Sequence, residues 1–206
     1  YLFREMIEAE RMPSLPIHVD SPMAIDVTHL YEKHQEDHSL ELETLEAQGD
    51  KPFSPPNLHF DKTVDESKQL NDVRYPTVII SASGMATGGR VVHHLERCLP
   101  DHRNTVLFVG FQAAGTRGRA IQSGAQNIKM YGHQVRVRAR IETIENLSAH
   151  ADYGEILAWL QRFAKAPEKT FMVHGEPMAS EALRQRIAQQ LHWDVSVPTY
   201  LQKVEL

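Results

Sequence analysis

Two histidines near the end of the chain stand at predicted turns, where imidazole side chains can bind a metal ion or move a proton near neutral pH. His150 lies in LSAHAD and His174 lies in VHGEP. Each follows a β-like segment and precedes a helix-like one. A single histidine at a turn is more often a hydrogen-bonded surface residue than a functional one. The question is therefore whether the two histidines act at one site.

The elements around the two histidines suggest that they are neighbours. Residues 136–144 are β-like, and Asp152 with Glu155 has the spacing of a capping box that starts a helix to about residue 164. Residues 169–173 form a short apolar strand, and Pro177 suits the first turn of another helix. A right-handed strand–helix–strand unit brings both turns to one sheet edge, where open α/β sheets bind ligands.

The residues alone do not establish a metal site. Zinc needs three or four protein ligands, whereas the chain has the single cysteine Cys98 and neither an H-x-H nor an H-E-x-x-H motif. One cysteine also excludes an internal disulfide, so we expect a cytoplasmic protein. No apolar run approaches the roughly 20 residues of a membrane-spanning helix.

Two glycine-rich stretches follow β-like segments and could receive an anion. SASGMATGGR (81–90) and GFQAAGTRGR (110–119) let backbone amides approach a ligand closely, and the second adds arginines that suit phosphate oxygens. The first is not a P-loop, because G-x-x-x-x-G-K-[ST] does not fit it. Glycine spacing is a weak signal, so a turn without a ligand has equal weight.

Charge is distributed unevenly, although the net charge of −5 argues against a bulk nucleic-acid binder. Between His102 and Ile141 there are seven Lys or Arg residues and no acid. Arg136, Arg138 and Arg140 alternate with apolar residues, which predicts three positive charges on one strand face. A solvated polar face and a surface that tracks phosphates are equally compatible with this pattern.

Helix-like and β-like segments alternate along the 206 residues, of which 41% are hydrophobic, and this predicts an α/β layered fold. Strands are predicted at 16–20, 77–81 and 105–110, the last two buried, and helices at 1–11, 22–35, 63–71 and 87–99. A hairpin is predicted around residues 131–133. The acid-rich stretch 32–50 and the proline-rich stretch 51–60 together are predicted to form an exposed connection. Because the sequence opens with Tyr1 instead of Met, we expect a piece of a longer protein.

Five motifs occur in a characteristic order: PIHVDSPMA (16–24), SASGMATGGRVVHHL (81–95), LFVGFQAAGTRGRAIQSGA (107–125), LSAHAD (147–152) and VHGEP (173–177). Together they resemble the β-CASP branch of the metallo-β-lactamase superfamily, whose members are RNA-processing zinc nucleases. The resemblance covers nearly the whole chain. It implies a three-layer β-CASP cap with a mostly parallel sheet at 1–147 and the C-terminal segment of a metallo-β-lactamase αββα core at 148–206.

The resemblance also implies roles for individual residues. His174 would be a ligand of one of two zinc ions, supported by Glu176, and His150 would act at the scissile phosphate, with Asp152 beside it. The two zinc ions would deprotonate the attacking water. The residues expected to contact RNA between cap and core are Ser83, Gly84, Gly88, Gly89, Arg90, His94, Arg117 and Arg119.

The sequence departs from the family in lacking the H-x-H-x-D-H metal motif, which we expect before Tyr1. We therefore expect the carboxyl-terminal part of a ribonuclease that neither holds zinc tightly nor cleaves RNA alone. Its partners would be RNA, the missing N-terminal half and, through an exposed apolar face, a second copy in a homo-dimer. Two alternatives stay open: a non-catalytic RNA-binding or scaffold protein, and a hydrolase of small phosphate or thioester substrates.

Overall fold

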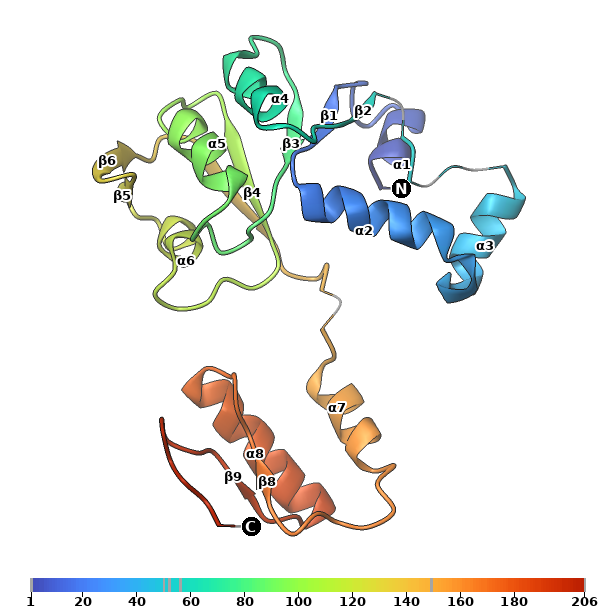
Figure 1. Cartoon of the computed structure of the whole chain (residues 1–206), viewed down its shortest axis with the longest axis vertical. Helices are drawn as coiled ribbons and strands as arrows, with labels where there is room; N and C mark the ends of the chain where they lie inside the picture. The colour runs from blue at the N-terminus through green and yellow to red at the C-terminus, as the bar shows by residue number, and fades with distance from the viewer. Residues whose placement is uncertain (1, 50, 52, 56, 149, 206) are drawn as a thin grey trace. The chain divides into compact units, whose positions relative to one another are not determined.

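A computed structural model of the chain describes residues 2–49, 51, 53–55, 57–148 and 150–205. The chain divides into two compact units, Tyr1–Asn146 (unit 1) and Leu147–Leu206 (unit 2). Helices and strands alternate (Figure 1), and strand pairing is parallel in three of the four sheets that the described residues form. The predicted α/β fold class is confirmed.

The first sheet of unit 1 consists of β1 (Ile17–Val19), β2 (Leu58–Phe60) and β3 (Val78–Ile80). β1 is the central strand, and both neighbours run parallel to it, with Ile17 opposite Leu58 and Val78. Ile17 and Asp20 are both 0% exposed. The carboxyl end of the central strand therefore carries a carboxylate into the interior.

The helices beside this sheet begin at polar side chains that accept hydrogen bonds from the first free amides. Ser21 caps its helix by accepting from Ala24 N, and Thr63 forms a reciprocal capping box with Glu66. The helical elements are α1 (Leu2–Glu8), α2 (Pro22–Lys33), η1 (Gln35–Asp37), α3 (Leu40–Ala47), α4 (Val64–Gln69) and η2 (Leu70–Asp72).

The second half of unit 1 is built on β4 (Thr105–Val109) and β7 (Arg140–Ile144), which pair in parallel. Around this pair lie α5 (Arg90–Cys98), α6 (Arg117–Gln122) and the antiparallel hairpin of β5 (Asn127–Met130) and β6 (His133–Arg136). Leu99, Ile121 and Met130 are fully buried in the core that these elements share. The antiparallel pairing of β5 with β6 confirms the predicted hairpin.

Three details of the sequence-based fold were wrong. β3 and β4 are not buried strands: Leu107 and Val109 are 49% and 53% exposed, because alternate residues of β4 face outward and only one face is covered. The predicted connection 32–60 contains η1, α3 and β2. The arginines at 136, 138 and 140 do not share a strand face, because β6 ends at Arg136 and the chain then crosses to β7.

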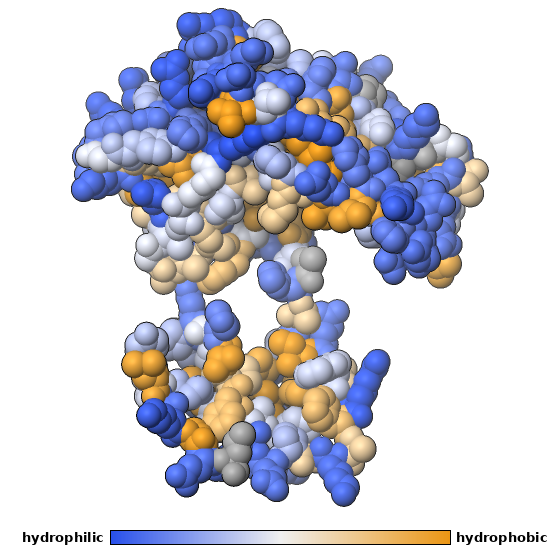
Figure 2. Space-filling model, in the orientation of Figure 1, coloured by the Kyte–Doolittle hydropathy of each residue, from blue (hydrophilic) through white to orange (hydrophobic). Residues whose placement is uncertain are grey.

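Unit 2 consists of α7 (Tyr153–Leu160), β8 (Thr170–Phe171), α8 (Pro177–Leu191) and β9 (Val195–Ser196). β8 and β9 pair in parallel, and Leu157, Leu160, Ile187 and Val195 form a small core. Hydrophobic residues reach the surface of this unit (Figure 2). Trp159, Val173 and Met178 are 60%, 62% and 88% exposed. Nowhere in the described part of the chain is a helix long and apolar enough to span a bilayer.

Candidate functional site

His150 is exposed in the turn that precedes α7, where its backbone N–H donates to Ser148 Oγ at 3.1 Å. Two residues later, Asp152 Oδ1 accepts from the amides of Gly154 and Glu155 at 2.7 and 2.9 Å. Glu155 Oε2 in turn accepts from Asp152 N at 2.9 Å, which completes the predicted capping box. Asp152 therefore fixes the helix start directly after an exposed imidazole.

His174 follows β8 in a turn that is held closely against α8. The residue is exposed and has a left-handed φ of 65°. At Gly175 an added Cβ would lie 2.2 Å from Oγ of the buried Ser180, so a side chain there would have to displace that hydroxyl. α8 begins at Pro177, as predicted, with Glu176 at its N-cap. The lack of a side chain at Gly175 lets the backbone next to His174 lie close to Ser180 of α8.

His174 was predicted to be a zinc ligand. Protein zinc sites use three or four ligands. Among the residues that the structure describes, no group of three or more His, Cys, Asp or Glu side chains could hold a metal ion. The role of His174 as a zinc ligand stays a prediction.

The strand–helix–strand unit predicted around the two histidines is not formed. β7, which precedes His150, pairs with β4 of unit 1, whereas β8, which precedes His174, pairs with β9. The described pairings therefore do not place the two preceding strands in one sheet, and the shared sheet edge expected from the sequence gives no support to the proximity of the two histidines. Joint action of the two histidines stays a prediction that rests on the motifs.

In unit 1, some of the residues predicted to contact RNA belong to a buried polar cluster. Asp20, at the end of β1, accepts hydrogen bonds from Ser67 Oγ, Arg90 Nη1 and His94 Nε2, each at 2.6 Å. We call these four residues the Asp20 cluster. Arg90 also donates to the carbonyls of residues 61 and 62, both at 2.8 Å. The cluster thereby joins β1, α4, α5 and the segment after β2.

The Asp20 carboxylate is charged although it is buried. Burial alone raises its pKa, but hydrogen bonds from Ser67, His94 and Arg90 and the charge of His94 lower the pKa below the usual 3.8. The second ring nitrogen of His94, Nδ1, lies 3.2 Å from Asn71 Oδ1. Both nitrogens of His94 are therefore engaged inside unit 1, which gives this side chain a positioning task.

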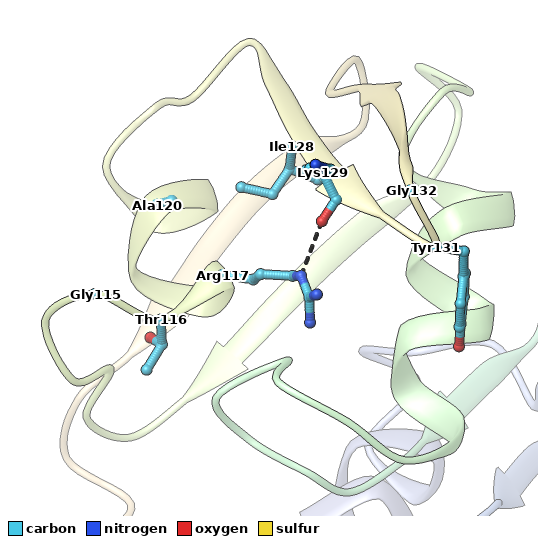
Figure 3. A pocket seen from close by; sticks show the side chains of 8 residues that line it. All are labelled: Gly115, Thr116, Arg117, Ala120, Ile128, Lys129, Tyr131 and Gly132. Carbon is cyan, nitrogen blue, oxygen red and sulfur yellow. Dashed lines mark hydrogen bonds between the residues drawn. The ribbon is translucent and has the colours of Figure 1, made fainter.

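Arg117 connects the two glycine-rich stretches through backbone carbonyls. Its Nε donates to Lys129 O at 2.9 Å (Figure 3), and its Nη1 donates to the carbonyls of Ala86 and Thr87 at 3.2 and 3.1 Å. Arg119, in contrast, is exposed and donates to Gln122 Oε1 at 3.1 Å. Arg117 therefore holds the turn before α5 against β5, while Arg119 faces solvent.

Four of the predicted RNA-contacting residues, Gly88, Gly89, Arg90 and Arg117, line one cavity of about 470 Å³ in unit 1. We call it the α4–α5 cavity. Gly89 has φ 75° at the N-cap of α5, a conformation that other residues rarely adopt. A smaller neighbouring cavity of about 360 Å³ (Figure 3) shares Arg117 and Tyr131 with it.

Ser83, Gly84, His94 and Arg119 are not among the described residues that line the α4–α5 cavity. The sequence reasoning in turn missed Asp20, Ser67 and Tyr131. Asp20 had a signal, because it is an acid placed between an apolar strand and a helix cap. No local sequence signal indicated Ser67, because the residue that it contacts, Asp20, is 47 positions away in the sequence.

Comparison with known families gives two matches in sequence order. Residues 1–121 match the model described as the Beta-Casp domain. Residues 134–198 match the model described as the Zn-dependent metallo-hydrolase RNA specificity domain.

Individual relatives cover most of the chain. "Ribonuclease TTHA0252" of Thermus thermophilus is 37% identical over 178 residues, which are 86% of this chain and 40% of the relative. "Transcription termination factor FttA" of Pyrococcus abyssi is 32% identical over 197 residues, 93% of this chain and 30% of the relative. FttA of Methanosarcina mazei is 28% identical over 211 residues, 100% of this chain and 33% of the relative. The chain spans only 30% to 40% of the length of these relatives.

Proposed function

The chain belongs to the β-CASP family of the metallo-β-lactamase superfamily, and on this premise we propose that it is the carboxyl-terminal part of a zinc-dependent ribonuclease. The reaction would be hydrolysis of RNA phosphodiester bonds. The observation that carries the proposal is the succession of a Beta-Casp match and an RNA-specificity match along one chain. The name of the ribonuclease relative supports it.

Within this proposal the two compact units have different tasks. Unit 1 would be the cap, with its end near residue 147, and unit 2 would be the closing segment of the metallo-β-lactamase core. Trp159, Val173 and Met178, which are exposed on unit 2, would then pack against the rest of that core. The rest of the core would correspond to the part of the relatives that this chain does not span.

His174 would contribute one zinc ligand, and the remaining ligands would come from outside the described residues. Glu176 adjoins the same turn, at the N-cap of α8, and would support the ligand. His150 would donate a proton to the leaving oxygen or hold the scissile phosphate, and an exposed imidazole is suited to both tasks. Asp152 would support it by fixing the backbone through the α7 cap.

The test compares the full-length protein with this chain alone. Elemental analysis should find two zinc ions per full-length molecule and less than one per isolated chain. The full-length protein should cleave a single-stranded RNA, with a 5′-blocked copy of the same RNA separating endonuclease from 5′-exonuclease activity. Stoichiometric, tightly held zinc in the isolated chain would contradict the assignment of the missing ligands.

A non-catalytic RNA-binding role is the second candidate, because several relatives are named transcription termination factors and not ribonucleases. The same experiment separates the two. If the full-length protein binds RNA but neither holds zinc nor cleaves RNA, the non-catalytic role is correct and the ribonuclease proposal is wrong.

A further inference from the structure

The α4–α5 cavity of unit 1 is large enough for a small ligand, since binding pockets typically measure about 300–1,000 Å³ and this one measures about 470 Å³. We propose that it binds one unpaired nucleotide of an RNA strand. The base would stack on Tyr131, and the phosphate would lie near Lys68 and the turn of residues 87–90. The inference rests on the proposed function in that RNA supplies the nucleotide.

The lining of the cavity carries positive charge. It includes Lys68, Arg90, His93 and Arg117, and none of its described lining residues is an Asp or a Glu. The charge of Arg90 is balanced by Asp20 at 2.6 Å. Among the described residues, the partners of Arg117 Nε and Nη1 are carbonyl oxygens, which accept hydrogen bonds but do not neutralise the charge of Arg117. Lys68 is exposed, and no described carboxylate lies within ion-pair distance of it. A phosphate would supply the missing negative charge.

The turn before α5 adds hydrogen-bond donors to this charge. Thr87, Gly88 and Gly89 are exposed and line the cavity. Within the described part of the chain, their amides donate to no backbone carbonyl. Arg117 holds the same turn through the Thr87 carbonyl at 3.1 Å. Amides in such a fixed turn can donate to phosphate oxygens without further ordering of the chain.

Tyr131 provides a surface for a base. Its side chain is 53% exposed and is stacked on the ring of His93, with 4.8 Å between centroids and 21° between planes. Both rings line the cavity. Glu96, whose charge acts on Tyr131, pairs with His133 Nε2 at 3.0 Å. Stacking on aromatic side chains is how proteins hold unpaired bases, because every base offers a flat face.

The Tyr131 ring can be removed without loss of the hairpin. Tyr131 and Gly132 form the two-residue turn between β5 and β6, with φ values of 46° and 88°. Asn-Gly is a preferred pair in such turns, and Asn tolerates positive φ. Tyr131→Asn should therefore keep the turn and remove only the stacking surface. Tyr75→Asn is the matched control, because Tyr75 is 57% exposed in the same unit and does not line the cavity.

The experiment measures binding of fluorescein-labelled hexaadenylate RNA by anisotropy, in the full-length protein carrying His150→Ala so that cleavage does not interfere. Tyr131→Asn should weaken binding by about 10-fold, whereas Tyr131→Phe should stay within about twofold of the parent. Lys68→Gln should lower the slope of log affinity against log salt by about 1. Tyr75→Asn should bind like the parent.

Equal binding by Tyr131→Asn and Tyr75→Asn would overturn the inference, as would a loss in Tyr131→Phe as large as in Tyr131→Asn. AMP that binds as tightly as the hexamer would assign the cavity to free nucleotides and overturn the RNA assignment. The proposed function is tested separately by cleavage. An intact Tyr131 effect in a protein that cannot cleave RNA leaves the cavity inference standing, and cleavage without a Tyr131 effect removes the cavity inference alone.

Discussion

The Asp20 cluster of unit 1 and the histidine turns of unit 2 use similar side chains in opposite ways. In the cluster, Asp20 is 0% exposed and both ring nitrogens of His94 have protein partners. In unit 2, His150 and His174 are exposed at turns whose backbones are fixed by a helix cap and by a glycine contact. Polar groups that are satisfied internally hold elements together, whereas exposed ones on a fixed backbone are available to a ligand.

The comparison predicts that the two regions respond differently to substitution. Loss of a cluster residue should lower stability, because a buried charge is left without its partner. Loss of an exposed histidine should lower activity and leave stability unchanged. Both tryptophans of this chain, Trp159 and Trp193, lie in unit 2. Their fluorescence therefore reports on the unfolding of unit 2 and not on that of unit 1.

The largest effect is expected from His150→Ala in the full-length protein. Removal of a group that transfers a proton typically slows a reaction by about 10²–10⁴-fold. Because His150 is exposed, the free energy of unfolding should change by less than about 0.5 kcal/mol. The rate of RNA cleavage and the hydrogen exchange of the unit 2 amides measure the two quantities.

The matched control is His102→Ala, which removes an imidazole that is 72% exposed in unit 1 and has no proposed role. It should leave the cleavage rate unchanged. If His150→Ala unfolds unit 2 as well as stopping cleavage, the contrast between the two regions fails.

Asp20→Asn should have the largest effect on stability. It keeps the shape of the side chain but leaves Arg90 and His94 without the carboxylate that each contacts at 2.6 Å. Removing one partner of a buried ion pair costs about 3–5 kcal/mol. Hydrogen exchange of the β1 and α5 amides reports the loss in unit 1.

Asp72→Asn provides the reference for Asp20→Asn. Asp72 is 79% exposed and pairs with Arg97 at 3.5 Å, so its substitution should cost no more than about 1 kcal/mol. A similar loss of unfolding free energy in the two variants would show that the Asp20 cluster stabilises unit 1 no more than an exposed ion pair does.

The pH dependence of the same comparison follows from the lowered pKa of Asp20. A carboxylate whose pKa is lower in the folded state adds stability above its unfolded pKa, and that stability is lost as pH falls through the folded value. The stability gap between the parent and Asp20→Asn should therefore be complete at pH 7 and shrink below about pH 4. A gap that is unchanged at pH 3 would mean that the charge of Asp20 is not what stabilises the cluster.

Local signals predicted the elements of the fold well. Ser21 with Pro22, Asp152 with Glu155, and Pro177 each mark a helix start that the structure confirms, because caps depend on residues close in sequence. Sheet membership was not predictable in the same way. The β-like run 136–144 divides between two sheets, and no local pattern states which strand will be its partner.

The same limit applies to the candidate site. Gly88, Gly89, Arg90 and Arg117 line one cavity, and their glycine-rich and basic sequence indicated an anion site. The pairing of Asp20 with His94 across 74 residues could not be derived from spacing, because it depends on how β1 and α5 pack. The motif resemblance predicted the family that the matches show, whereas the roles of His150 and His174 stay predictions.

A smaller effect is expected at the turn that carries His174. Gly175→Ala places a Cβ 2.2 Å from Ser180 Oγ, and insertion of a methyl group into a packed contact costs about 1–3 kcal/mol. The double variant Gly175→Ala with Ser180→Ala removes the opposing oxygen and should recover most of the loss. Tryptophan fluorescence in urea reports both, since Trp193 packs against the core of unit 2. Equal stability of the single and double variants would show that Ser180 does not hold this turn.

The smallest effect is expected from Asp152→Ala, and it separates structure from function next to His150. Asp152 accepts from the amides of Gly154 and Glu155, and removal of such a cap costs about 1 kcal/mol. Asp152→Ser can still cap, so it should recover most of the stability. If Asp152 only fixes the backbone, cleavage by Asp152→Ser should follow its recovered stability. An Asp152→Ser variant that is stable yet cleaves as slowly as Asp152→Ala would show that the carboxylate acts on the reaction through its charge. The turn would then contribute two groups to the reaction, the imidazole of His150 and the carboxylate of Asp152.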